Sequence, residues 1–233
     1  MKENFSLKIG TMRTAFELNE GKAPKNLREV RVLDKDEDLL YTEKYNQGKL
    51  SCVISNDGHE KWEFFYNSQG KLSEENVNGH TTLYFYNSDG TLQSMVNIFN
   101  RTKTDYYYIN NKLVSERIYD SEKLLWQTDY RYDTNGKIIY TCQYGNDCYG
   151  KWGVLNEEWF LYNHSNRLFY KKTEDYEERR EYDKNNRLVL IRIKDVFWKE
   201  NLEKQIYYNE FGFVDRINVN GKVDSLFDYL FED

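Results

Sequence analysis

Three aspartates at alternate positions, Asp34, Asp36 and Asp38, are the first residues whose type and spacing could bind a cation. A calcium-binding EF-hand loop needs a glycine at its sixth position and a glutamate at its twelfth. Here those positions hold Leu39 and Tyr45. The pattern therefore predicts a solvent-exposed loop, and we expect the chain to hold no metal ion and no other cofactor.

Cysteine and histidine side chains supply the other candidate chemistry. Cys142 and Cys148 are separated by five residues with no nearby histidine, whereas structural zinc sites have closer cysteine pairs, usually in duplicate. A nucleophilic cysteine needs a positioned base, but the histidines His59, His80 and His164 all lie near expected turns. We predict no catalytic residue and no enzymatic activity, and the sequence leaves the role of the two cysteines open.

The composition indicates which elements must position any site. The chain of 233 residues is long enough to bury a core without disulfide bonds. Its apolar material is concentrated in 21 Tyr, 13 Phe and 5 Trp residues, and aromatic side chains favour β-sheet over helix. We therefore expect an all-β protein.

Charge and hydropathy restrict the expected partners and location. The net charge is −6, and no basic stripe is present to bind a phosphate backbone, so nucleic acid is not an expected partner. The chain begins without an apolar run of signal-peptide length, and no later segment has the ~20 apolar residues that span a membrane. These features predict a cytoplasmic protein with no membrane partner.

A short motif centred on tyrosine recurs along the chain. The segment YNSQGKL from Tyr66 is repeated, with variations, at intervals of 20 to 30 residues. The tyrosines that begin these segments are Tyr45, Tyr66, Tyr86, Tyr108, Tyr132, Tyr162, Tyr182 and Tyr208. This period is typical of one β-hairpin per repeat, so the sequence predicts about eight consecutive hairpins.

The fourth residue after the tyrosine is of a type that accepts a positive φ in a tight turn. In the six full-length motifs it is Gly70, Gly90, Gly136, Asn166, Asn186 or Gly212. Before each turn, side chains two residues apart share one face of a strand, which groups aromatic residues such as Trp62, Phe64 and Tyr66. The other face is mixed. This alternation predicts an antiparallel meander that forms one curved or spiralling sheet, either open or closed.

We expect three regions along the chain. The repeat array covers residues 41–215, and residues 1–40 and 216–233 are interpreted as N-terminal and C-terminal caps. Caps are expected because a repeat array must cover its terminal edges.

The segment NGHTTLYFYNSDGTL, residues 78–92, resembles the consensus of the YD repeats of Rhs-type proteins. The resemblance covers roughly residues 40–215 and implies a short stand-alone array of antiparallel hairpins. The aspartate of the Tyr-Asp pair is present only at Asp133 and Asp183, and most other motifs have asparagine there. The self-cleaving core and toxin regions of the family have no counterpart. MORN-type antitoxin repeats are a weaker alternative, because their paired glycines are missing.

Two intervals between motifs are longer than the rest, and both contain aromatic residues. These residues, Tyr144, Tyr149, Trp152, Phe197 and Trp198, are expected on connections at one edge of the sheet. Aromatic side chains on irregular loops favour partner binding. The alternative is that they fold back as a lid over the aromatic face.

The first functional hypothesis is a cytoplasmic immunity or antitoxin protein that neutralises a polymorphic, Rhs-type toxin. The resemblance to Rhs systems implies this role, and the acidic charge would complement a toxin domain with a basic surface. The alternatives are a structural shell segment of a larger Rhs-like assembly, or a carbohydrate-binding module that uses tyrosine and tryptophan faces.

Overall fold

The computed structural model of this chain describes residues 23–196 and 198–231. Within these residues the protein is an all-β antiparallel meander of eighteen strands, which confirms the predicted fold class. None of the described segments forms a helix with the length and apolar character needed to cross a membrane.

The strands are bounded as follows. In chain order they are β1 Leu27–Leu33, β2 Leu39–Asn46, β3 Lys49–Ser55, β4 Lys61–Tyr66, β5 Leu72–Val77, β6 His80–Tyr86, β7 Leu92–Asn97, β8 Thr102–Ile109, β9 Lys112–Asp120, β10 Lys123–Tyr132, β11 Ile138–Asn146, β12 Trp152–Tyr162, β13 Leu168–Lys172, β14 Tyr176–Tyr182, β15 Leu188–Asp195, β16 Asn201–Tyr208, β17 Val214–Val219 and β18 Lys222–Phe231.

The chain divides into two compact units. Unit 1 comprises the described residues up to Glu60 together with Arg179–Ile193 and those from Asn201 onward. Unit 2 comprises Lys61–Glu178 and, apart from residue 197, Lys194–Glu200. Strands β1–β3 and β16–β18 therefore lie in unit 1, and β4–β13 lie in unit 2.

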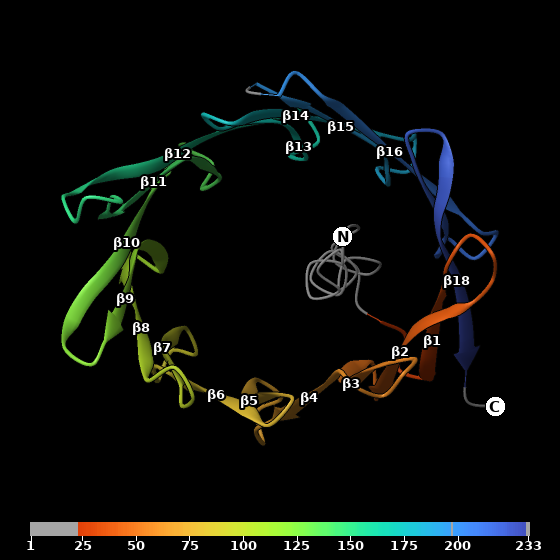
Figure 1. Cartoon of the computed structure of the whole chain (residues 1–233), viewed down its shortest axis with the longest axis horizontal. Helices are drawn as coiled ribbons and strands as arrows, with labels where there is room; N and C mark the ends of the chain where they lie inside the picture. The colour runs from red at the N-terminus through yellow and green to blue at the C-terminus, as the bar shows by residue number, and fades with distance from the viewer. Residues whose placement is uncertain (1–22, 197, 232–233) are drawn as a thin grey trace. The chain divides into compact units, whose positions relative to one another are not determined.

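In unit 1 the first and last strands pair with each other. Strand β1 is hydrogen-bonded to β2 on one side and to β18 on the other, with Val30 opposite Tyr229 and Val32 opposite Phe227. Figure 1 shows β1 beside β18. The described parts of the two expected caps, residues 1–40 and 216–233, thus include paired strands. This pairing corrects the prediction of a spiralling sheet, which would leave its first and last strands unpaired with each other.

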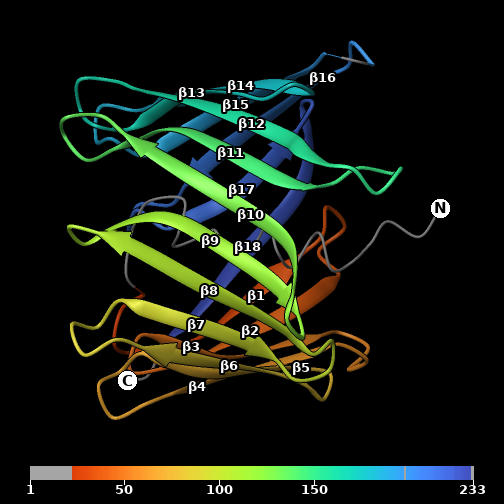
Figure 2. The ribbon, with the colours of Figure 1, turned by 90° about the vertical axis from the view of Figure 1, so that its left-hand side faces the viewer.

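In unit 2 the strands β4–β10 run side by side, each antiparallel to the next (Figure 2). The register places one set of aromatic residues on a single face, which we call the tyrosine face. Its aromatic residues are Trp62, Phe64, Tyr66, Tyr84, Tyr86, Tyr106, Tyr108, Trp126, Tyr130, Tyr132, Phe160 and Tyr162. On the opposite face, Phe65, Phe85 and Trp159 are exposed.

The turns after the motif tyrosines have the predicted backbone. Gly70, Gly90, Gly136 and Gly212 have φ between 76° and 88°, and Asn166 and Asn186 have φ of 58° and 60°. In the first of these turns the Asn67 carboxamide oxygen accepts the amides of Gln69 and Lys71. The turn is therefore specified by residues within the motif itself.

The motif tyrosines also link one hairpin to the preceding one. The hydroxyl of Tyr132 donates to the Leu113 carbonyl oxygen at 2.6 Å, and that of Tyr208 donates to the Leu188 carbonyl oxygen at 2.7 Å. Tyr86 makes the same bond to Leu72. A basic side chain from the preceding turn lies over the ring in the pairs Lys71–Tyr86, Lys112–Tyr132, Lys137–Tyr162 and Arg187–Tyr208.

Candidate functional site

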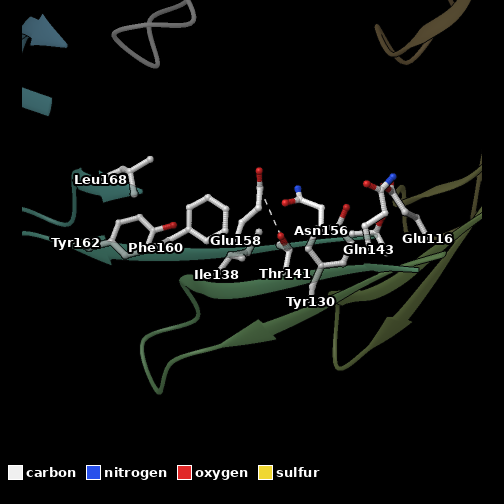
Figure 3. Close-up of a pocket in the computed structure, with 11 residues that line it drawn as sticks. Glu116, Tyr130, Ile138, Thr141, Gln143, Asn156, Glu158, Phe160, Tyr162 and Leu168 are labelled. Atoms are coloured by element: carbon white, nitrogen blue, oxygen red, sulfur yellow. Dashed lines mark hydrogen bonds between the residues drawn. The ribbon is translucent and has the colours of Figure 1, made fainter. Parts of the chain in front are cut away.

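A groove of about 390 Å³ opens on the tyrosine face of unit 2. The side chains that line it come from strands β9 to β13. They are Glu116, Thr128, Tyr130, Ile138, Thr141, Gln143, Asn156, Glu158, Phe160, Tyr162 and Leu168. Figure 3 shows these side chains standing on one side of the sheet. We refer to this site as the groove.

The strand register explains why these residues meet. Thr128 on β10 lies opposite Gln143 on β11, which lies opposite Asn156 on β12. Two residues further along each strand, and on the same face, Tyr130, Thr141 and Glu158 form a second row. Because directly opposed residues point to the same face of a sheet, the two rows make a floor of amide, hydroxyl and carboxylate groups.

Glu158 is one of two carboxylates in the groove, and it is paired. The Lys171 ammonium lies 2.7 Å from its carboxylate, and the Thr141 hydroxyl donates to it at 3.4 Å. The same ammonium lies over the rings of Phe160 and Tyr176, 5.6 Å and 5.5 Å from their centroids. Burial lowers the pKa of Lys171, but its hydrogen bonds to Glu158 and Tyr176 outweigh burial and raise the pKa overall.

Glu116 is the second carboxylate, and its cross-strand neighbours are neutral. Tyr106 on β8 and Thr128 on β10 lie opposite it, and the Tyr130 hydroxyl is hydrogen-bonded to it. Burial first, and then the charge of Glu116, raise the pKa of Tyr106 to about 12. The same two causes raise the pKa of Tyr130. Glu116 therefore places negative charge among partly buried phenols.

The loop residues predicted as a partner site lie elsewhere. Tyr149 is 90% exposed in the β11–β12 turn, Trp152 begins β12, and Trp198 is 73% exposed in the β15–β16 connection. Tyr144 is half-buried on β11 and points to the opposite face, while Phe197 lies outside the described residues. Neither Tyr149 nor Trp198 covers the tyrosine face, and none of the described residues in this set lines the groove.

The segment around Tyr149, which lies in one of the two longer intervals between motifs, is a regular turn. The Asp147 carboxylate accepts the amides of Tyr149 and Lys151, as Asn67 does in the first full-length motif. Gly150 has a φ of 79°, like the motif glycines. The spacing of Asp147 and Gly150 was the sequence signal for this turn.

The groove was not predicted, because its polar residues lie within strands and not on loops. The signal in the sequence is their phase: Asn156 and Glu158 alternate with the same period as Phe160 and Tyr162. Polar residues two and four positions before an aromatic pair mark a face that is not closed by apolar packing.

The cysteines lie away from the groove. Cys142 is buried on the opposite face, between Asp129 and Glu157 on the neighbouring strands. A hydrogen bond with Cys142 raises the pKa of Tyr144. Cys148 is exposed in the β11–β12 turn. Among the described residues, no group of three or more His, Cys, Asp or Glu side chains is placed to hold a metal ion.

The sequence matches no protein-family model and no curated protein. Among solved structures, it is similar to a porin-like protein from Bacteroides uniformis ATCC 8492, with 12% identity and a TM-score of 0.49. This match covers 91% of the chain and 99% of that protein. A porin-like protein from Bacteroides vulgatus ATCC 8482 matches 88% of the chain and 98% of its own length, with 12% identity and a TM-score of 0.31.

These matches contradict the predicted cytoplasmic immunity or antitoxin protein, since the matched proteins are described as porin-like. That prediction rests on the resemblance to Rhs systems and on acidic charge, and neither feature specifies a function by itself. Both the immunity role and the cytoplasmic location are therefore withdrawn. At 12% identity and TM-scores below 0.5, no activity is transferred from the matched proteins to this chain.

Proposed function

We propose that this chain is a non-enzymatic binding protein and that the groove is its binding site. The observation that carries this proposal is the groove itself, in which hydrogen-bonding and aromatic side chains from five strands surround about 390 Å³. Ligand pockets in proteins have volumes of about 300–1,000 Å³ and combine apolar walls with a few placed polar groups. The strands hold these groups in fixed register.

The residues near the groove support binding more than catalysis. A nucleophile is activated by a base within hydrogen-bond reach. His59 and His164 lie in connections between strands, His80 begins β6, and Cys142 faces away from the groove. The groove presents amides, hydroxyls and carboxylates that suit reversible recognition.

We also propose that the array consists of about eight YD-like hairpin repeats. Support comes from the tyrosine hydroxyl that donates to the carbonyl of the preceding hairpin in both units, at Tyr132 in unit 2 and at Tyr208 in unit 1. Such bonds tie each hairpin to its predecessor and fix the register of the floor beneath the groove.

The proposed binding site is tested by substituting a residue of its floor with a larger side chain that blocks the groove. Gln143→Trp fills the groove, whereas Gln127→Trp places the same side chain on the opposite face of the adjacent strand β10. Calorimetric titration uses cadaverine, citrate and maltotriose as cationic, anionic and neutral probes. We expect at least one probe to bind the unmodified chain with a Kd below about 1 mM, and Gln143→Trp alone to abolish binding.

Two results would overturn the proposed function. One is that no probe binds the unmodified chain. The other is that both tryptophan variants reduce binding equally, which would place the ligand outside the groove.

A further inference from the structure

The charges in the groove are unbalanced. Its lining contains two carboxylates, Glu116 and Glu158, and none of its eleven lining residues is lysine or arginine. The ammonium of Lys171 is paired with Glu158. A second ammonium, that of Lys137, lies over the ring of Tyr162. Glu116 is therefore the lining carboxylate that is not paired with Lys171, and its cross-strand neighbours Tyr106 and Thr128 are neutral.

The Glu158–Lys171 pair shows how this sheet holds a cation. The ammonium lies 2.7 Å from the carboxylate and also over two aromatic rings. Both side chains of the pair are partly buried, with 18% and 23% exposed. A carboxylate beside the faces of phenol or phenyl rings attracts a cation by charge and by the ring quadrupole together.

Glu116 has the same kinds of neighbours without a lysine across from it. Its cross-strand partners are Tyr106 and Thr128, and the Tyr130 hydroxyl is hydrogen-bonded to it. Strands β10 and β11 lie between the strands that carry the two carboxylates. At about 4.8 Å per strand, three spacings separate them by about 14 Å, which is too far for one metal ion.

We infer that the groove binds an organic cation, an ammonium or guanidinium group, with its charge at the Glu116 carboxylate. This inference rests on the proposed function of the groove. An anion is repelled by the two carboxylates, and a neutral ligand leaves the charge of Glu116 without a cationic partner. The cation is carried either by a free amine or by a lysine or arginine side chain of a basic protein partner, which the net charge of −6 also attracts.

The test compares a variant of Glu116 with variants of two adjacent carboxylates on β12 that point to opposite faces. Glu158 lines the groove, and its neighbour Glu157 lies on the opposite face across from Cys142. Calorimetric titrations of Glu116→Gln, Glu158→Gln and Glu157→Gln use cadaverine as the free amine and N-acetylarginine amide as the side chain. Maltotriose is the neutral probe, and thermal unfolding of each variant verifies that it is folded.

We expect Glu116→Gln to weaken binding of both cations about tenfold, as the loss of a charge-assisted hydrogen bond does. Glu158→Gln also weakens binding, because it releases the Lys171 ammonium, which then competes with the ligand. Glu157→Gln leaves binding unchanged. Lys171→Met tightens binding, because it removes the competing cation. Tighter binding of the arginine probe identifies a protein side chain as the source, and tighter binding of cadaverine identifies a free amine.

Equal cation affinity in the unmodified chain and in Glu116→Gln would overturn the inference. So would equal losses in Glu116→Gln and Glu157→Gln. If maltotriose alone binds, and Gln143→Trp abolishes that binding, the cation is wrong but the groove remains the binding site. If no probe binds, both the inference and the proposed function fail.

Discussion

The two units use the same hairpin motif but bury it to different extents. Six residues after the motif tyrosine stands Leu188 or Val214 in unit 1, and each is 1% exposed. The corresponding residues of unit 2, such as Leu72 and Leu168, are only partly buried. In unit 1, Leu188, Ile206 and Val214 form an apolar core, whereas Leu168 forms part of the wall of a polar groove.

This difference separates what the motif determines from what it leaves free. The turn, the register and the tyrosine bond recur in both units, since they depend on residues within adjacent hairpins. The residues that precede the tyrosine determine whether the face packs or stays open. Ile206 stands two residues before Tyr208 in the core, and Thr128 stands four residues before Tyr132 in the groove. Binding is therefore expected in unit 2 and stability in unit 1.

The largest effect on stability is expected from shortening the leucine at the same motif position in each of the two units. Leu188→Ala removes a fully buried side chain and leaves a cavity, so it should lower the free energy of unfolding by about 3 kcal/mol. Leu168→Ala removes a partly exposed wall of the groove and should cost about 1 kcal/mol. Urea unfolding measures both. Equal losses would remove the contrast between the units.

A second pair of variants tests the turns, which the comparison predicts to be alike. Gly136 in unit 2 has a φ of 82°, and Gly212 in unit 1 has a φ of 84°. An added Cβ would meet only the ends of Lys112 or Arg187 at 3.5 Å and 3.8 Å, so the cost is backbone strain. Each Gly→Ala change should cost about 1–2 kcal/mol.

The control for the turns is asparagine, which occupies this position at Asn166 and Asn186 with positive φ. Gly136→Asn should therefore cost less than Gly136→Ala. Strain in the backbone of one residue does not depend on distant packing. If the losses of stability from the two Gly→Ala changes differ by more than about 1 kcal/mol, the cost is therefore not determined by the turn alone.

The tyrosine bond is the third element common to both units. Tyr132→Phe and Tyr208→Phe each remove a hydroxyl that donates to a carbonyl of the preceding hairpin. We expect a loss of about 1 kcal/mol in each case, a typical net value for one hydrogen bond. Tyr149→Phe, whose side chain is 90% exposed, is the matched control and should change the unfolding midpoint little.

The sequence predicts what neighbouring residues determine. The turn glycines, the alternation of Trp62, Phe64 and Tyr66, and the antiparallel meander all follow from spacing within one hairpin. The groove depends on five strands in register, and no single hairpin contains it. The sequence draws attention to the exposed loop residues Tyr149 and Trp198 and not to Asn156. The length of an interval between motifs can be read from the sequence, whereas the depth of a groove on a face of the sheet cannot.

The smallest expected effect concerns the basic side chains that lie over the motif tyrosines. The Lys112 ammonium in unit 2 lies 5.4 Å from the centroid of Tyr132. Lys112→Met keeps most of the aliphatic contact but removes the charge, so it should cost about 0.5 kcal/mol, as expected for an exposed cation–π contact. Lys151→Met, at an exposed turn position of the same unit, is the control.

The corresponding residue in unit 1 sharpens the comparison. The Arg187 guanidinium lies 4.5 Å from the centroid of Tyr208 and also 2.7 Å from the Asp183 carboxylate. Arg187→Met therefore loses two interactions and should cost more than Lys112→Met, with the excess reduced at high salt because it is an ion pair. A larger loss at Lys112 would mean that unit 2 depends on these contacts more than unit 1 does.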